Sequence, residues 1–150
     1  MEFIKKYFEK RPVGFYISLS ACALCIIASI TYWLGYLLIN QASIGKYYTW
    51  TTPTILLVGS LLFLVVMYFD KVAEVATPIL WVSTLSAFGL SLVGQPIEKG
   101  YMYFTEAFYN GFSFSAIFSL AFGFIVPFTC MILALGLSFA GIVMKQGRRK

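Results

Sequence analysis

The sequence predicts an all-α integral membrane protein in which four transmembrane helices form a single bundle. Hydrophobic residues make up 60% of the 150 residues and charged residues only 11%, a composition typical of membrane proteins. Four apolar segments are candidates to cross a hydrocarbon core of ~30 Å. The charges lie almost entirely between and outside these segments. A chain of this length is expected to form one domain, residues 1–150.

The fourth apolar segment, residues 112–144, contains no charged residue and would measure roughly 45–50 Å as a helix. It is therefore expected to span the membrane with length to spare. Pro127 lies near its middle, where a proline removes the backbone hydrogen bond to the carbonyl of Gly123 and favours a kink. The sequence leaves open whether this kink is a hinge or a static bend.

The first three spans are expected at residues 14–39, 54–69 and 78–94. The first is longer than the apolar region of a cleavable signal peptide, which runs roughly 7–15 residues, so we expect it to be retained. Pro53 and Pro78 mark the starts of the second and third spans, because proline is favoured in the first turn of a helix. Residues 70–77 are then expected to form a tight turn between them.

Residues 2–10 are expected to form a short amphipathic helix in the membrane interface. Phe3, Ile4, Tyr7 and Phe8 share one helical face, and charged residues occupy the other. This pattern is typical of helices that lie flat on a membrane with the apolar side down.

The basic residues predict the orientation. All but two of the 11 lysines and arginines lie in the N-terminal segment, the 70–77 turn and the C-terminal tail, whereas Lys46 and Lys99 lie in the other two loops. By the positive-inside rule both termini are expected in the cytoplasm, on the inner side of a plasma (inner) membrane that the chain crosses several times. The basic residues at the two chain ends are candidate contacts for anionic lipids: Lys5, Lys6, Lys10, Arg11, Lys145, Arg148, Arg149 and Lys150.

Small residues recur along one face of the first, third and fourth spans, and small residues let helices approach closely within lipid. The second span carries only Gly59 and Ser60 among bulky residues, so we expect it to face mainly lipid or a partner. The candidate packing residues of the other three spans are Gly14, Ser18, Cys22, Cys25, Ser29, Ala87, Ser91, Gly123, Ala134 and Gly141.

The chain offers little chemistry for catalysis. It has no histidine, and its six acidic residues are all expected in loops or tails. This argues against a proton-coupled transporter, which needs ionisable groups at membrane depth. Cys22 and Cys25 form a C-x-x-C inside the first span, away from the helix N-terminus that activates redox cysteines. An enzyme acting at the membrane surface would have to use Asp70, Glu74 or Glu106, which read as ordinary solvated charges. We therefore expect no enzyme activity, no cofactor, no metal and no nucleic-acid partner.

The two loops on the predicted outer side are rich in aromatic residues. Aromatic residues anchor protein interfaces, and they also mark the membrane boundary. The candidate partner-binding residues in these loops are Tyr47, Tyr48, Trp50, Glu98, Lys99, Tyr101, Tyr103, Phe104, Glu106, Phe108 and Tyr109.

From these observations we expect a non-catalytic accessory or scaffolding subunit of a membrane protein complex. It would lie in the lipid bilayer and dock onto another membrane protein, or onto copies of itself, through the outer loops or the second span. The alternative is a small oligomeric channel or transporter for a neutral or apolar solute. In that case the path would be lined by hydroxyl side chains of the third and fourth spans: Ser83, Thr84, Ser86, Ser91, Ser113, Ser115 and Ser119.

Overall fold

The computed structural model shows a helical chain. The residues it describes are 8, 11–38, 50–69, 72–93, 104–105, 108–109, 111–112, 114, 117–118 and 121–146, and among them there is no strand. The long elements are α2 (Val13–Leu38), α3 (Thr51–Tyr68), α4 (Ala73–Val93), the π-helical turn η2 (Ala121–Ile125) and α7 (Val126–Ile142).

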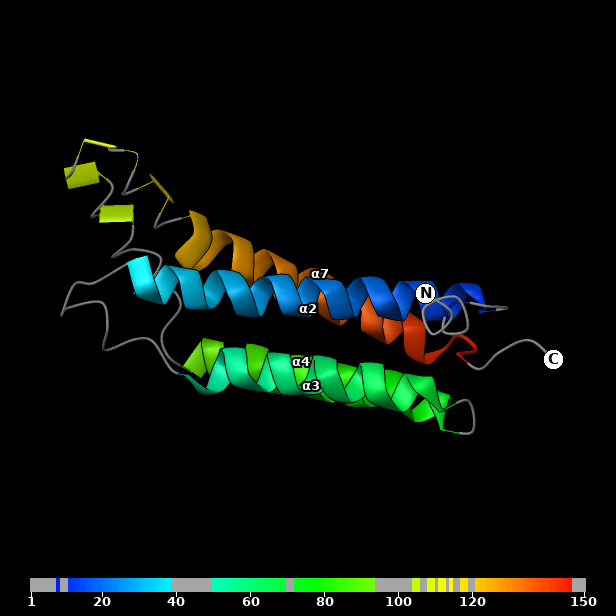
Figure 1. Cartoon of the computed structure of the whole chain (residues 1–150). Coiled ribbons are helices and arrows are strands. Elements are labelled where there is room, and N and C mark those ends of the chain that lie inside the picture. Colours follow the sequence, from blue (N-terminus) through cyan, green and yellow to red (C-terminus); the bar gives the residue numbers. More distant parts are fainter. Residues whose placement is uncertain are drawn as a thin grey trace.

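Four helices of the described chain are long and apolar enough to cross a membrane, and η2 and α7 together form the last of them. They pack as a ring in which α2 contacts α3 and α7, and α4 contacts the same two helices from the other side. Neighbouring helices run antiparallel (Figure 1). The start of α2, the end of α7 and the connection between α3 and α4 therefore lie together at what we call the terminal end. The opposite end, where α2 ends and α3 begins, is the loop end.

The first three spans lie close to the predicted ranges, but α3 and α4 begin earlier than their prolines suggest. Pro53 is the third residue of α3, where its missing N–H costs nothing because the first four N–H groups of a helix have no intrahelical partner. Pro78 lies inside α4, which begins at Ala73. The turn expected over 70–77 is therefore shorter, and backbone hydrogen bonds from Phe69 to Val66 and from Val72 to Phe69, both 3.0 Å, hold its edges.

The fourth span begins later than the predicted residue 112. Phe112 lies in a turn with a φ of 52°, directly after Gly111 at 62°, and a bulky residue at positive φ cannot belong to a helix. The kink at Pro127 stays a prediction, but the π-helical turn η2 ends at Ile125, directly before α7 and two residues before this proline. A π turn shifts the hydrogen-bond register by one residue, so the helix can pass a proline that lacks an N–H. At its other end α7 stops at Ile142, two residues before the predicted end at 144.

The predicted packing residues of the first, third and fourth spans are all buried. They are Gly14, Ser18, Cys22, Cys25, Ser29, Ala87, Ser91, Gly123, Ala134 and Gly141. Two of the glycines mark points of close approach. A Cβ on Gly14 would meet Met144, Lys145 and Gln146, and a Cβ on Gly141 would overlap Ser18. The small side chains therefore set where α2 and α7 touch.

The expectation that the second span faces mainly lipid or a partner fits only one of its faces, because the other face is packed inside the bundle. Helix α3 packs against both α4 and α2, and it buries Leu56, Phe63 and Met67 completely or almost completely. Gly59 gives α4 its close approach, because a Cβ there would overlap Ser83. Helices can pack closely through small residues, and they can also pack through large apolar side chains that fill the space between them. The scarcity of small residues in the second span therefore did not predict that this helix is exposed. Only one face of α3 remains open, with Leu61, Leu62 and Val65 exposed.

Candidate functional site

The interior of the bundle contains a polar seam along one face of α2. Ser29 donates to the carbonyl of Pro53 in α3 at 2.8 Å, and Cys22 donates to the carbonyl of Ser60 at 3.7 Å. Cys25 lies 3.2 Å from the hydroxyl of Thr84 in α4. Nearer the terminal end, Thr77 of α4 donates to Ser18 at 3.1 Å.

This seam joins helices and has the character of a packing device. Polar groups removed from water are costly unless they are hydrogen-bonded, and each of these α2 side chains has a partner on α3 or α4. The cysteines of the C-x-x-C are free thiols within this seam, and Cys130 of α7 is a free, half-buried thiol outside it. Cys22 contacts α3 and Cys25 contacts α4 in the described structure, and a role in helix packing stays the interpretation that the sequence favours.

The hydroxyls considered for a solute path are directed to the backbone of their own helix. Thr84 donates to the carbonyl of Leu80 at 2.7 Å, and Ser91 donates to that of Phe88 at 2.6 Å. Ser83 and Ser86 bond in the same way to carbonyls one turn earlier. Ser113, Ser115 and Ser119 lie outside the described residues.

Arg11 lies at the terminal end, just before α2. The sequence predicts it as a lipid contact, but its side chain is only 7% exposed. Its Nη2 donates to the carbonyl of Met67, in the last turn of α3, at 3.0 Å. Its guanidinium carbon lies 5.0 Å from the centroid of the Phe15 ring. A positive charge is favourable at a helix C-terminus because of the helix dipole, so Arg11 ties α2 to α3. Of the other predicted lipid contacts, Lys145 is exposed and the rest lie outside the described residues.

Gln146, which follows the C-terminus of α7 and is 1% exposed, hydrogen-bonds to the end of this helix and to α4. Its side-chain Nε2 donates to the carbonyls of Gly141 at 2.5 Å and Met144 at 3.1 Å, which satisfies the end of α7. Its backbone N–H donates to a carboxylate oxygen of Glu74, in the first turn of α4, at 3.3 Å. The stretch from Met144 to Gln146 therefore folds back over Gly14 and joins α7 to α2 and α4. We call these contacts the foot of α7.

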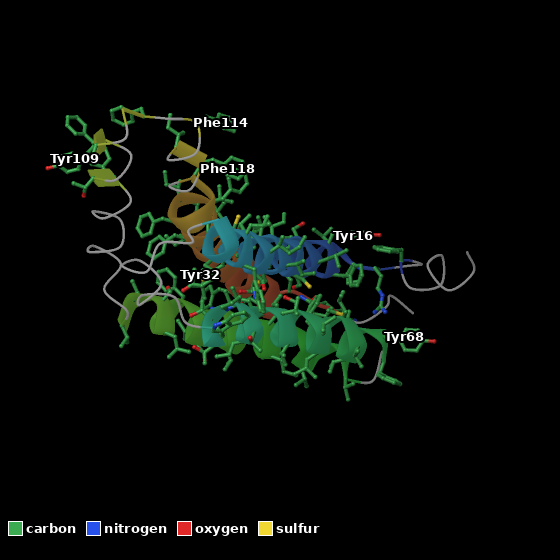
Figure 2. The ribbon with its side chains drawn as sticks, turned by 60° about the vertical axis from the view of Figure 1, so that its left-hand side comes forward. Tyr16, Tyr32, Tyr68, Tyr109, Phe114 and Phe118 are labelled. Atoms are coloured by element: carbon green, nitrogen blue, oxygen red, sulfur yellow. The ribbon has the colours of Figure 1, made fainter. Side chains whose placement is uncertain are left out.

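The opposite, loop end carries aromatic rings that are exposed except for the half-buried Phe118, and we call them the outer aromatic surface. The ring of Phe108 lies edge-on to the rings of Tyr109 and Phe112, with centroid distances of 6.4 Å and 5.9 Å. Phe114 stacks on Phe118 at 5.9 Å, and Phe118 contacts Phe122 at 4.2 Å. Tyr109 and Phe114 are each 84% exposed. Figure 2 shows Tyr109, Phe114 and Phe118 at the end of the molecule away from Tyr16 and Tyr68. The surface comprises Phe104, Phe108, Tyr109, Phe112, Phe114 and Phe118.

Only part of this surface could be identified from the sequence. Phe104, Phe108 and Tyr109 were expected there, and all three are exposed. Phe112, Phe114 and Phe118 were missed because the range from 112 onward was assigned to a membrane span. The sequence does contain a signal for these rings, because phenylalanines recur every four residues at positions 104, 108 and 112 and again at 114, 118 and 122.

The remaining candidates from the outer loops are placed only in part. Trp50 is exposed and packs edge-on against Trp33 of α2, with ring centroids 4.5 Å apart. The others lie outside the described residues: Tyr47, Tyr48, Glu98, Lys99, Tyr101, Tyr103 and Glu106. Of the predicted interfacial helix at 2–10, only Phe8 is described. It is helical, and its ring lies 5.7 Å from that of Phe15.

Within the described stretches, no group of three or more histidine, cysteine or acidic side chains could hold a metal ion. The described residues thus form an interior with hydrogen bonds between helices, a terminal end joined through Arg11 and Gln146, and an aromatic surface at the loop end. Comparisons with models of protein families, with curated proteins and with solved structures give no match for this chain.

Proposed function

We propose that the chain is a non-catalytic subunit of a membrane protein complex, and that it docks onto another membrane protein through the outer aromatic surface. In this proposal the four helices cross the plasma membrane, and the terminal end, with both chain termini, faces the cytoplasm. The single observation that carries the proposal is the 84% exposure of both Tyr109 and Phe114, each of which belongs to a group of contacting rings at the loop end.

The residue types of the outer aromatic surface favour a docking site over an aromatic belt at the membrane boundary. Belt residues are chiefly tryptophan and tyrosine, whose polar groups reach the water. The outer aromatic surface is mainly phenylalanine, which has no polar group to hydrate. Covering an exposed phenylalanine is favourable by about 1.5–3 kcal/mol, and large aromatic side chains are typical anchors of protein interfaces. A partner that covers several of these rings at once would therefore bind with useful affinity.

The proposal is tested by placing a photoreactive phenylalanine analogue at Tyr109 or at Phe114, in cells that express the full chain. Val65 is the matched control, because it is exposed on α3 far from the outer aromatic surface. We expect irradiation to join the protein to one discrete polypeptide from positions 109 and 114, and to give no such product from position 65.

Two outcomes would contradict the proposal. Adducts to lipid alone from all three positions would mean that the rings form only a membrane belt. An adduct of twice the chain's own mass would mean that the surface joins copies of this protein, which would favour the alternative of an oligomeric channel or transporter.

A further inference from the structure

Contacts between the helices show which residues lie at the same depth in the bundle. Thr77 of α4 donates to Ser18 of α2, and Gly141 of α7 lies against the same serine. Farther along α2, Cys22 lies against Ser60 of α3. Since each helical residue adds ~1.5 Å along the axis, the depth of other residues can be counted from these pairs, along the helix directions that Figure 1 shows.

At the terminal end, two tyrosines and two charges lie at nearly one depth, which we call the tyrosine boundary. Counted from the contacts above, Tyr16, Tyr68 and Glu74 lie within about one helical turn of one another. Tyr16 and Glu74 are exposed and Tyr68 is half-buried. The exposed Lys145 follows the end of α7 at the same end of the bundle. Tyrosines and charges of this kind are typical of the edge of a hydrocarbon core.

Toward the loop end, two tryptophans form a second edge, which we call the tryptophan boundary. Trp33 of α2 and Trp50, directly before α3, pack edge-on with ring centroids 4.5 Å apart. The exposed Thr51 and Thr54 follow Trp50 in the first turn of α3. Tryptophan is enriched at membrane–water interfaces because its ring is apolar and its N–H is polar. Helix α2 continues beyond Trp33 to Leu38, so the tryptophans and α3 define this boundary.

The two boundaries are close together for a membrane protein. The helical rise from Tyr16 to Trp33 is about 26 Å, and the rise from Trp50 to Tyr68 is about 27 Å. Two helices thus give nearly the same separation. A typical hydrocarbon core measures ~30 Å, which is about 3–4 Å more. The exposed side chains of α3 between the boundaries are apolar from residue 57 onward: Leu57, Val58, Leu61, Leu62 and Val65.

We propose that the α2–α3 side of the bundle fits a thin bilayer, and that the protein therefore prefers lipids with short acyl chains. In a thicker bilayer the lipid around this side has to thin, which costs free energy for each ångström of mismatch. Short chains avoid that cost. The inference rests on the proposed function only in that the helices cross a membrane, and it does not involve the docking partner.

Competition between brominated and unlabelled phosphatidylcholines, in vesicles that contain the purified full chain, tests this preference. Bromine quenches tryptophan fluorescence on contact, so the relief of quenching gives the relative binding constant of the unlabelled lipid. Trp81 of α4 is the reporter, because it is half-buried between the two boundaries and its ring lies 6.3 Å from that of the exposed Phe139.

Two matched double variants leave Trp81 as the only tryptophan of the chain. The first combines Trp33→Tyr with Trp50→Tyr and keeps amphipathic rings at the tryptophan boundary. The second combines Trp33→Leu with Trp50→Leu and extends the apolar surface of α2 toward its end at Leu38.

We expect the tyrosine variant to bind lipid with sixteen-carbon chains at least twofold more tightly than lipid with twenty-two-carbon chains. In the leucine variant this difference should shrink or reverse. Equal or tighter binding of the longer lipid by the tyrosine variant would overturn the proposal. The same preference in both variants would overturn the role given to the tryptophan boundary. A lack of quenching by every brominated lipid would contradict the membrane location itself, and with it the proposed function.

Discussion

Replacing Gly141 with alanine should loosen the crossing of α2, α4 and α7. An ideal Cβ at this position would overlap the hydroxyl oxygen of Ser18 and lie 3.1 Å from Cγ2 of Thr77. Overpacking of this kind costs about 1–3 kcal/mol. Gly136 is the matched control, since it lies in the same helix and a Cβ there meets nothing within 4 Å. Both variants gain the same helix propensity, so the difference between them isolates the steric cost.

A second substitution shows whether the cost arises where the structure places it. Ser18→Ala removes the overlapping oxygen, and the closest remaining atoms would be Thr77 Cγ2 at 3.1 Å and Ser18 Cβ at 3.5 Å. Alone it should cost only ~0.6 kcal/mol, because Thr77 loses one hydrogen-bond partner within the bundle. Combined with Gly141→Ala it should be less destabilising than the sum of the two, by about 0.5–3 kcal/mol.

The free energy of unfolding can be measured in mixed micelles by titration with a denaturing detergent, followed by tryptophan fluorescence. The reasoning is refuted if Gly141→Ala is no more destabilising than Gly136→Ala. It is also refuted if the effects of Ser18→Ala and Gly141→Ala simply add, because then the two residues do not share a contact.

Three further predictions use the same measurement. Arg11→Met should lower the free energy of unfolding by about 1.5–3 kcal/mol, since it removes a charged donor from the carbonyl of Met67. A loss no larger than that of the exposed Lys145→Met would show that the contact is unimportant. Gly59→Ala should cost about 1–3 kcal/mol through its overlap with Ser83, against little effect from Gly89→Ala, where a Cβ meets nothing within 4 Å. Equal effects would mean that α3 is not packed against α4. Replacing Cys22 and Cys25 together with alanine should cost only about 1 kcal/mol, for two helix–helix contacts. Because both thiols are free, a reducing agent should not change the stability of the unsubstituted protein, and a shift on reduction would contradict this role.

Much of the fold could be predicted from the sequence because long apolar helices leave a strong local signal. Apolar length alone indicated four helices, and the candidate packing residues proved to be buried. The errors at the helix starts come from two prolines that do not stand at the first helical position: one lies in the first turn, where a missing N–H costs nothing, and the other lies in the helix interior, where membrane helices tolerate proline. Pro53 is the third residue of α3, and Pro78 lies well inside α4.

Other features depend on contacts between distant parts of the chain. Composition gave no hint that Phe63 and Met67 would fill the centre of the bundle. Nor could a polar tail predict that Gln146 folds back over Gly14, since that contact joins the two ends of the chain. The outer aromatic surface was found only in part, because Phe112 and Phe114 continue an apolar run that resembles a span.

The most direct test of the docking proposal compares how much partner co-purifies in mild detergent with the tagged full chain and with two variants. One variant carries Phe108→Ala, Tyr109→Ala and Phe114→Ala, and the other carries Leu61→Ala, Leu62→Ala and Val65→Ala on the exposed face of α3. We predict a stoichiometric partner with the unsubstituted chain and with the α3 variant, and at least a tenfold lower yield of it with the aromatic variant. Equal recovery of the partner with the aromatic variant, while that variant stays folded, would contradict docking through the outer aromatic surface.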